Sequence, residues 1–181
     1  GNNSCCSRSI RYGNMVHNVR TIDCVLADGT KATFGEVPED LGALAGPERY
    51  RDLVGTMRGI AAGVAGELAS ERWPKLLRRV GGYNIDMIRP HEVYGLGRNE
   101  AGHNMAKLLV GSEGTLGFFT GLELDLSPVP PAKTLGICHF PTFYQAMAVV
   151  KRIVELDPSA VELVDRTMIE LARDIAIFRP T

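Results

Sequence analysis

The sequence predicts an α+β fold, and three segments carry that prediction. Two β-rich runs, residues 21–26 and 31–34, flank Ala27-Asp28-Gly29-Thr30, a turn sequence typical of a β-hairpin. Apolar residues between 46 and 72 recur at three- and four-residue spacing, which indicates an amphipathic helix. Within residues 118–127, three leucines (122, 124 and 126) alternate with Glu123 and Asp125, as apolar and polar side chains do in a half-buried strand.

The helical segment contains one apolar stripe, and Pro47 suits its first turn because that position needs no N–H partner. The members of the stripe are Leu53, Met57, Ile60, Ala61, Val64 and Leu68. We expect a second helix over residues 71–80, ended by Gly81-Gly82. Residues 83–100 read as irregular. A short helix through Ala106, Leu108 and Leu109 should follow.

Pro128-Val129-Pro130-Pro131 is the one clear boundary signal, because proline cannot donate to a ladder and disfavours helix before it. We therefore predict one domain over residues 1–131 and the beginning of another over 132–181. The second segment reads as strand, helix, strand and helix, which is half of an α+β or α/β unit. The strands are expected at 134–140 and 161–164, and the helices at 142–156 and 166–176.

Composition excludes several classes of protein. The 181 residues are 45% hydrophobic and 23% charged, which is typical of a globular chain. The net charge of −1 gives no electrostatic attraction to nucleic acid, and no apolar run approaches the roughly 20 residues of a membrane span. Four cysteines without a C-x-x-C pair, and four scattered histidines, predict no metal site. Free thiols favour a cytoplasmic location.

The run Gly111-Ser112-Glu113-Gly114-Thr115-Leu116-Gly117 is a candidate ligand loop. Three glycines in seven residues let the backbone approach another group, and exposed N–H groups can face a phosphate or a ring carbonyl. A tight turn feeding a strand explains the run equally well. It is not a P-loop, because no Gly-Lys-Ser/Thr follows, and Gly95-Leu96-Gly97 does not match a Rossmann fingerprint either.

A second candidate is the opening segment Gly1-Asn2-Asn3-Ser4, together with Arg11, Tyr12 and Gly13. Small polar residues with arginines suit a loop along an anionic, hydrogen-bond-rich ligand. A solvated loop is the alternative that composition alone favours. The start without Met predicts that the chain is an excised piece of a longer protein.

These stretches, in their order and spacing, resemble the FAD-linked oxidases of the vanillyl-alcohol-oxidase or PCMH-type group. That group includes D-lactate dehydrogenases, the flavin-carrying component of glycolate oxidase and D-2-hydroxyglutarate dehydrogenase. The matching runs begin at Gly1, Arg8, Val25 and Leu108. Residues 78–84 resemble the larger members, in which the flavin part is fused to an iron–sulfur part.

The resemblance implies the second FAD-binding subdomain of the PCMH-type fold, a mostly antiparallel sheet flanked by helices, plus the start of an α+β cap domain. It implies FAD contacts by backbone groups along three segments and no catalytic residue in this chain. The implied cofactor-binding residues are Gly1, Asn2, Asn3, Ser4, Arg11, Tyr12, Gly13, Gly111, Ser112, Glu113, Gly114, Thr115, Leu116 and Gly117. Cys6 departs from the family, which usually has glycine there.

The implied activity of the parent protein is oxidation of a 2-hydroxy acid, D-lactate as first choice, by hydride transfer to flavin. An iron–sulfur cluster elsewhere in the parent and an electron acceptor at the inner membrane are further implications. Two alternatives stay open. The chain could be a non-catalytic structural module that does not bind FAD without the family's upstream subdomain, or an unrelated α+β binding domain. In either role, apolar surface without its partner domains predicts self-association.

Overall fold

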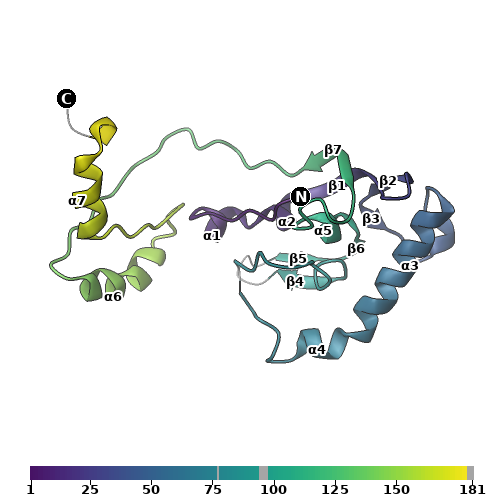
Figure 1. Ribbon diagram of the computed structural model, residues 1–181. Coiled ribbons are helices and arrows are strands. Elements are labelled where there is room, and N and C mark those ends of the chain that lie inside the picture. The colour runs from purple at the N-terminus through teal and green to yellow at the C-terminus, as the bar shows by residue number, and fades with distance from the viewer. Residues whose placement is uncertain (77, 94–97, 179–181) are drawn as a thin grey trace. The chain divides into compact units, whose positions relative to one another are not determined.

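The computed structural model describes residues 1–76, 78–93 and 98–178, so the Gly95-Leu96-Gly97 stretch lies outside the described residues. The chain divides into two compact units, Gly1–Pro128 and Val129–Thr181, and the division falls within the proline-rich segment. Helices and antiparallel strands alternate through the first unit (Figure 1). The predicted α+β class is confirmed.

The largest sheet has three strands in the order β2-β1-β7, all antiparallel. The predicted hairpin is confirmed: β1 (Val19–Val25) pairs with β2 (Lys31–Phe34). Asp28 fixes the turn, because its Oδ1 accepts a hydrogen bond of 2.9 Å from the Thr30 N–H. That backbone hydrogen bond is the main cause that lowers the pKa of the Asp28 carboxyl.

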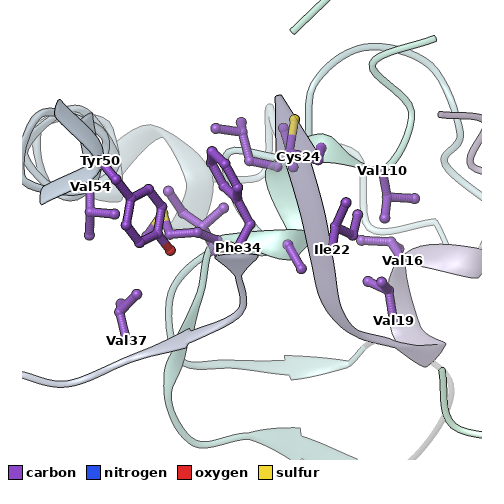
Figure 2. Packing of buried hydrophobic residues seen from close by; sticks show 14 of the residues in the cluster. Val16, Val19, Ile22, Cys24, Phe34, Val37, Tyr50, Val54 and Val110 are labelled. Carbon is purple, nitrogen blue, oxygen red and sulfur yellow. The ribbon is translucent and has the colours of Figure 1, made fainter. Parts of the chain in front are cut away.

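The main helix, α3 (Glu48–Gly63), packs on this sheet, and the shorter α4 (Ala65–Ala69) follows after a break at Val64. The core joins them through Phe34 of β2 and Tyr50 of α3, whose ring centroids lie 4.9 Å apart in an edge-to-face arrangement (Figure 2). Such pairs stabilise by about 0.5–1.5 kcal/mol beyond the area that they bury.

The predicted apolar stripe is correct in part. Ala61 and Leu68 are buried, whereas Ile60 is 48% exposed. The buried face is instead completed by Tyr50 and Val54, because the helix turns this side toward β2.

Short elements complete the first unit. At the start lie α1 (Ser9–Tyr12) and α2 (Met15–Asn18), and a 3-10 turn, η1 (Leu41–Ala43), precedes α3. β3 (Glu36–Val37) pairs with β6 (His103–Asn104), and the predicted short helix is confirmed as α5 (Ala106–Leu109). A further pair, β4 (His91–Val93) with β5 (Arg98–Glu100), corrects the prediction that residues 83–100 are irregular. Its mostly polar sequence carries no alternating pattern that would mark a strand.

The predicted helix over residues 71–80 is wrong, because residues 71–76 and 78–80 form turns and coil. Pro74 has no N–H and disfavours the helical conformation at Trp73. Side-chain contacts then hold the segment. Arg79 forms a charged pair with both carboxylate oxygens of Asp86 and lies with its guanidinium 5.3 Å from the centre of the Trp73 ring.

The strand predicted over residues 118–127 exists as β7 (Phe118–Leu124), but it is shorter than expected, and fewer of its side chains are buried than expected. Leu124 contacts the core, whereas Leu122 is 59% exposed and Leu126 is 86% exposed. Among the described strands β7 pairs with β1 alone, and a register irregularity between Asp23 and Cys24 interrupts that pairing. The alternation of leucines therefore does not produce the expected buried face.

The second unit contains α6 (Phe143–Val154), α7 (Arg166–Asp174) and the 3-10 turn η2 (Ala176–Phe178). Both predicted helices are confirmed. Thr142 and Asp165 cap them by accepting hydrogen bonds from the N–H groups of Gln145 and Met168. None of the described residues of this unit is buried, so it has no hydrophobic core of its own in that part of the chain.

The predicted strands at 134–140 and 161–164 are wrong, since both segments are coil. A strand requires a neighbour that takes up its backbone N–H and C=O groups. Neither segment has such a neighbour among the described residues. The apolar side chains remain in solvent, with Leu135 84% exposed and Val164 62% exposed.

Candidate FAD-binding wall

The opening segment lies directly against the glycine-rich loop, although the two are more than 100 residues apart in sequence. The Glu113 N–H donates a hydrogen bond of 3.0 Å to the Gly1 carbonyl oxygen. A Cβ on Gly1 would lie 3.1 Å from Glu113 Cα, and a Cβ on Gly111 would lie 3.3 Å from Asn3 Cβ. Glycine at these positions lets the backbones of the opening segment and the glycine-rich loop lie in direct contact. The N-terminus accordingly lies close to α5 (Figure 1).

The loop after α5 has an unusual backbone. Gly111, Glu113 and Gly114 have φ angles of 84°, 49° and 88°, in the left-handed region. The Thr115 N–H and Oγ1 both donate to the Ser112 carbonyl, over 2.9 and 2.6 Å. No atom lies within 4 Å of the place where a Cβ on Gly114 would be. The loop is thus a fixed turn with one open side.

Asn3 anchors the opening segment. Its side chain is buried, and its Oδ1 accepts a hydrogen bond of 3.1 Å from the N–H of Val16 at the start of α2. The Ser4 carbonyl accepts from the Met15 N–H over 3.4 Å. These bonds hold residues 1–4 between α2 and the glycine-rich loop.

The third predicted stretch, Arg11 to Gly13, leads into this anchor. Arg11 is exposed at the end of α1, and Tyr12 is half-buried. The Tyr12 carbonyl accepts a hydrogen bond of 2.9 Å from Asn18 Nδ2. Gly13 has φ 73° and turns the chain from α1 into α2. The stretch therefore leads the chain into α2, whose Met15 N–H donates to the Ser4 carbonyl, and the Arg11 side chain is exposed.

Three residues that the sequence did not mark support the wall. The Tyr83 hydroxyl lies 2.9 Å from Thr115 Oγ1, within hydrogen-bond distance. Asn84 Nδ2 donates to the carbonyls of Lys107 and Val110, which fixes α5 and the start of the loop. The buried Lys107 donates its Nζ to the Val16 carbonyl over 2.8 Å. Only the family resemblance of residues 78–84 pointed toward any of them.

Two buried polar atoms in the wall have no hydrogen-bond partner in the part of the chain that the structure describes: Asn3 Nδ2 and Ser112 Oγ. Both side chains are only 2% exposed. An unpaired buried polar group costs about 1–3 kcal/mol, so an arrangement with two such groups needs an explanation. A donor amide and a hydroxyl beside a turn with one open side are suited to a polar ligand.

The end of the run packs on the protein itself. Leu116 contacts the hydrophobic core, and a Cβ on Gly117 would collide with Cys24 Sγ and with the Val25 carbonyl oxygen, the latter at 2.9 Å. Gly117 is thus explained by close packing on β1. Any ligand contact at these two positions would have to involve the backbone.

The cysteines show no metal or redox arrangement. Cys5, Cys6 and Cys138 are exposed free thiols, and burial raises the pKa of the Cys24 thiol. The Cys6 N–H donates to Ser9 Oγ over 2.9 Å, so its backbone is engaged in the start of α1. The described part of the chain holds no group of three or more His, Cys, Asp or Glu side chains that could bind a metal ion. It also has no helix long and apolar enough to cross a bilayer.

The first unit thus holds a polar turn against a distant glycine-containing segment, and comparisons with known proteins show what the chain resembles. Residues 129–180 match the family described as FAD linked oxidases, C-terminal domain. This part of the chain is therefore similar to the C-terminal domain of the FAD-linked oxidases.

The relatives are named for two substrates. A D-2-hydroxyglutarate dehydrogenase of Pantoea ananatis is 27% identical over 172 residues, which covers 92% of this chain and 16% of the relative. A mitochondrial D-lactate dehydrogenase (cytochrome) of Arabidopsis thaliana is 35% identical over 74 residues, which covers 40% and 13%. A D-lactate dehydrogenase of Archaeoglobus fulgidus is 29% identical over 123 residues, which covers 67% and 24%.

The chain therefore spans between about one eighth and one quarter of the length of these relatives. No solved structure matches it significantly.

Proposed function

We propose that the chain forms one wall of the FAD site in an FAD-dependent oxidoreductase that oxidises a 2-hydroxy acid. The observation that carries the proposal is the contact between residues 1–4 and 111–114, together with the two unpaired polar atoms beside it. The names of the relatives support a 2-hydroxy acid as substrate, with D-lactate and D-2-hydroxyglutarate as the two candidates.

The residues present fit the cofactor. FAD offers phosphate, ribityl and ring oxygens that accept hydrogen bonds, and Asn3 Nδ2 and Ser112 Oγ are donors of the matching kind. Both atoms are shielded from solvent in this structure, so the adjacent loop would have to move for FAD to reach them. When bound, FAD supplies the acceptor of the substrate hydride. The proposed role of the chain's own residues is to orient the cofactor and to exclude water on this side of it. The base that removes the hydroxyl proton is assigned to residues outside this chain.

We propose FAD contacts at all the cofactor-binding residues predicted from the sequence. At Asn3 and Ser112 the side chains would make the contact, and at the other residues backbone groups would make it. For the domains we propose that residues 1–131 belong to the FAD-binding domain and 132–181 begin the cap. An iron–sulfur cluster in the parent, a cytoplasmic location and an acceptor at the inner membrane stay predictions.

Enzyme identity is tested by the visible spectrum of the protein that contains this chain. We expect flavin absorption that bleaches under anaerobic conditions when D-lactate or D-2-hydroxyglutarate is added, and that persists with the L-enantiomers. A protein that is colourless, and remains so after FAD is added and excess cofactor is removed, contradicts the proposal.

Replacing Ser112 by Ala separates a ligand wall from a simple turn. Since Ser112 Oγ has no partner among the residues that the structure describes, its removal should leave the free energy of unfolding unchanged or raise it by up to about 1 kcal/mol. The same change should weaken FAD binding about tenfold, as expected for the loss of one hydrogen bond. Flavin fluorescence titration measures the affinity, and Ser127→Ala, at an exposed coil position, is the matched control. Equal affinity of both variants would show that Ser112 does not contact the cofactor.

A structural module that does not hold FAD by itself is the second candidate, and the second unit favours it. α6 and α7 bury no residue, and their exposed apolar side chains include Phe143, Met147, Met168 and Leu171. Such a surface needs a covering partner, which in the family is the remainder of the cap. In its absence we expect the 181-residue chain to self-associate. Light scattering that shows a monomer at high concentration would contradict this expectation.

A further inference from the structure

A cavity of about 320 Å³ lies in the first unit, away from the residues of the proposed flavin wall. Its apolar lining comes from the end of α3, the start of α4 and the loop before β4, and consists of Ala61, Ala62, Ala65 and Pro90. Small side chains leave the space open. The volume falls at the lower end of the range for small-molecule sites, which is about 300–1,000 Å³.

The remaining lining residues are basic: Arg58, Arg89 and His103. One acidic residue meets this group, because Glu39 Oε2 accepts a hydrogen bond of 2.8 Å from Arg58 and Glu39 Oε1 lies 3.4 Å from His103 Nδ1. Arg58 makes two further hydrogen bonds, because it also donates to the carbonyls of Pro38 and Glu39. Glu39 can balance only one of the two guanidinium charges.

Two lining residues have a buried nitrogen without a hydrogen-bond partner in the described part of the chain: His103, whose Nδ1 lies near Glu39, and Arg89. Its Nε is buried and has no hydrogen-bond partner among the described residues. A guanidinium presents its N–H groups in a fork that matches the two oxygens of a carboxylate. A carboxylate in the cavity, beside the Arg89 guanidinium, would balance the second positive charge.

We propose that this cavity is a binding site for a small aliphatic carboxylate, held by Arg89 and lined by alanines along its hydrocarbon part. The alanines and Pro90 favour an organic acid over inorganic phosphate, which offers these walls no apolar surface. The proposal rests on the cavity and its charges, and it stands independently of the FAD site.

The test uses butyrate as the probe, with butyramide and phosphate as comparison ligands, in ¹H–¹⁵N spectra that include the arginine Nε–H signals. We expect butyrate to shift the Arg89 Nε–H signal in a saturable way, while butyramide and phosphate bind at least tenfold more weakly. The Arg89→Gln variant identifies this signal and should lose binding at least tenfold. Arg72→Gln removes the same charge at an exposed position and should bind as the wild type does.

A second variant, Ala65→Leu, fills the cavity without changing charge, and leucine is a good helix former at this position in α4. It should abolish the butyrate shift while the amide spectrum elsewhere retains its dispersion. The proposal is overturned by no saturable shift with butyrate, by equal binding to Arg89→Gln, or by equal binding to Ala65→Leu. Phosphate or butyramide binding as tightly as butyrate would also overturn it.

Discussion

Replacing Phe34 by Ala should destabilise the first unit by about 3–5 kcal/mol, the range measured for removal of a buried phenylalanine ring. Phe34 is 1% exposed, lies edge-to-face on Tyr50, and contacts the core between β2 and α3. A small cavity of about 120 Å³ already borders this ring, and the variant would enlarge it. Denaturation by urea, followed by circular dichroism, measures the change.

The matched control is Phe118→Ala on β7, because the Phe118 side chain is 73% exposed. That substitution should change the free energy of unfolding by less than about 0.5 kcal/mol. A loss below about 1 kcal/mol in Phe34→Ala, or equal losses in both variants, would contradict this packing of the core.

Gly117→Ala should cost about 1–3 kcal/mol, the usual penalty for forcing extra volume into a packed site. The added Cβ would collide with the buried Cys24 Sγ and lie 2.9 Å from the Val25 carbonyl oxygen, so β7 would have to move away from β1. The same denaturation experiment detects the loss.

An alanine at Gly59 should have the opposite effect. Gly59 lies inside α3, and no atom comes within 4 Å of the position of its added Cβ. Alanine there should raise the free energy of unfolding by about 0.5–1 kcal/mol, because it removes the conformational cost of a helical glycine. A stabilising Gly117→Ala variant would show that β7 packs on β1 more loosely than these distances indicate.

Local signals decided which elements the sequence could predict. The hairpin around Asp28-Gly29, the helix after Pro47 and the capped helices after Thr142 and Asp165 all follow from residues close together in the chain. The errors have non-local or competing causes. Pro74 and the Arg79–Asp86 pair override the helical pattern of residues 71–80, and the expected strands of the second unit lack neighbours among the described residues.

The candidate wall could be predicted only in part. Motif order, through its resemblance to a known family, pointed to both the opening segment and the glycine-rich run, but no local rule brings Gly1 to Glu113. Asn3 Nδ2 and Ser112 Oγ lack hydrogen-bond partners among the described residues. This depends on which groups lie near them in three dimensions, and the sequence alone does not show that. The role of Gly117 was also hidden, since its neighbour Cys24 lies on a distant strand.

Hydrogen–deuterium exchange of the protein that contains this chain, with and without FAD, tests the central claim that two distant segments form one cofactor wall. FAD should slow the exchange of amides within residues 2–4 and within residues 112–117 together, while the amides of α3 stay unchanged. Protection of only one segment, or of neither, in a protein that demonstrably holds FAD would contradict this claim.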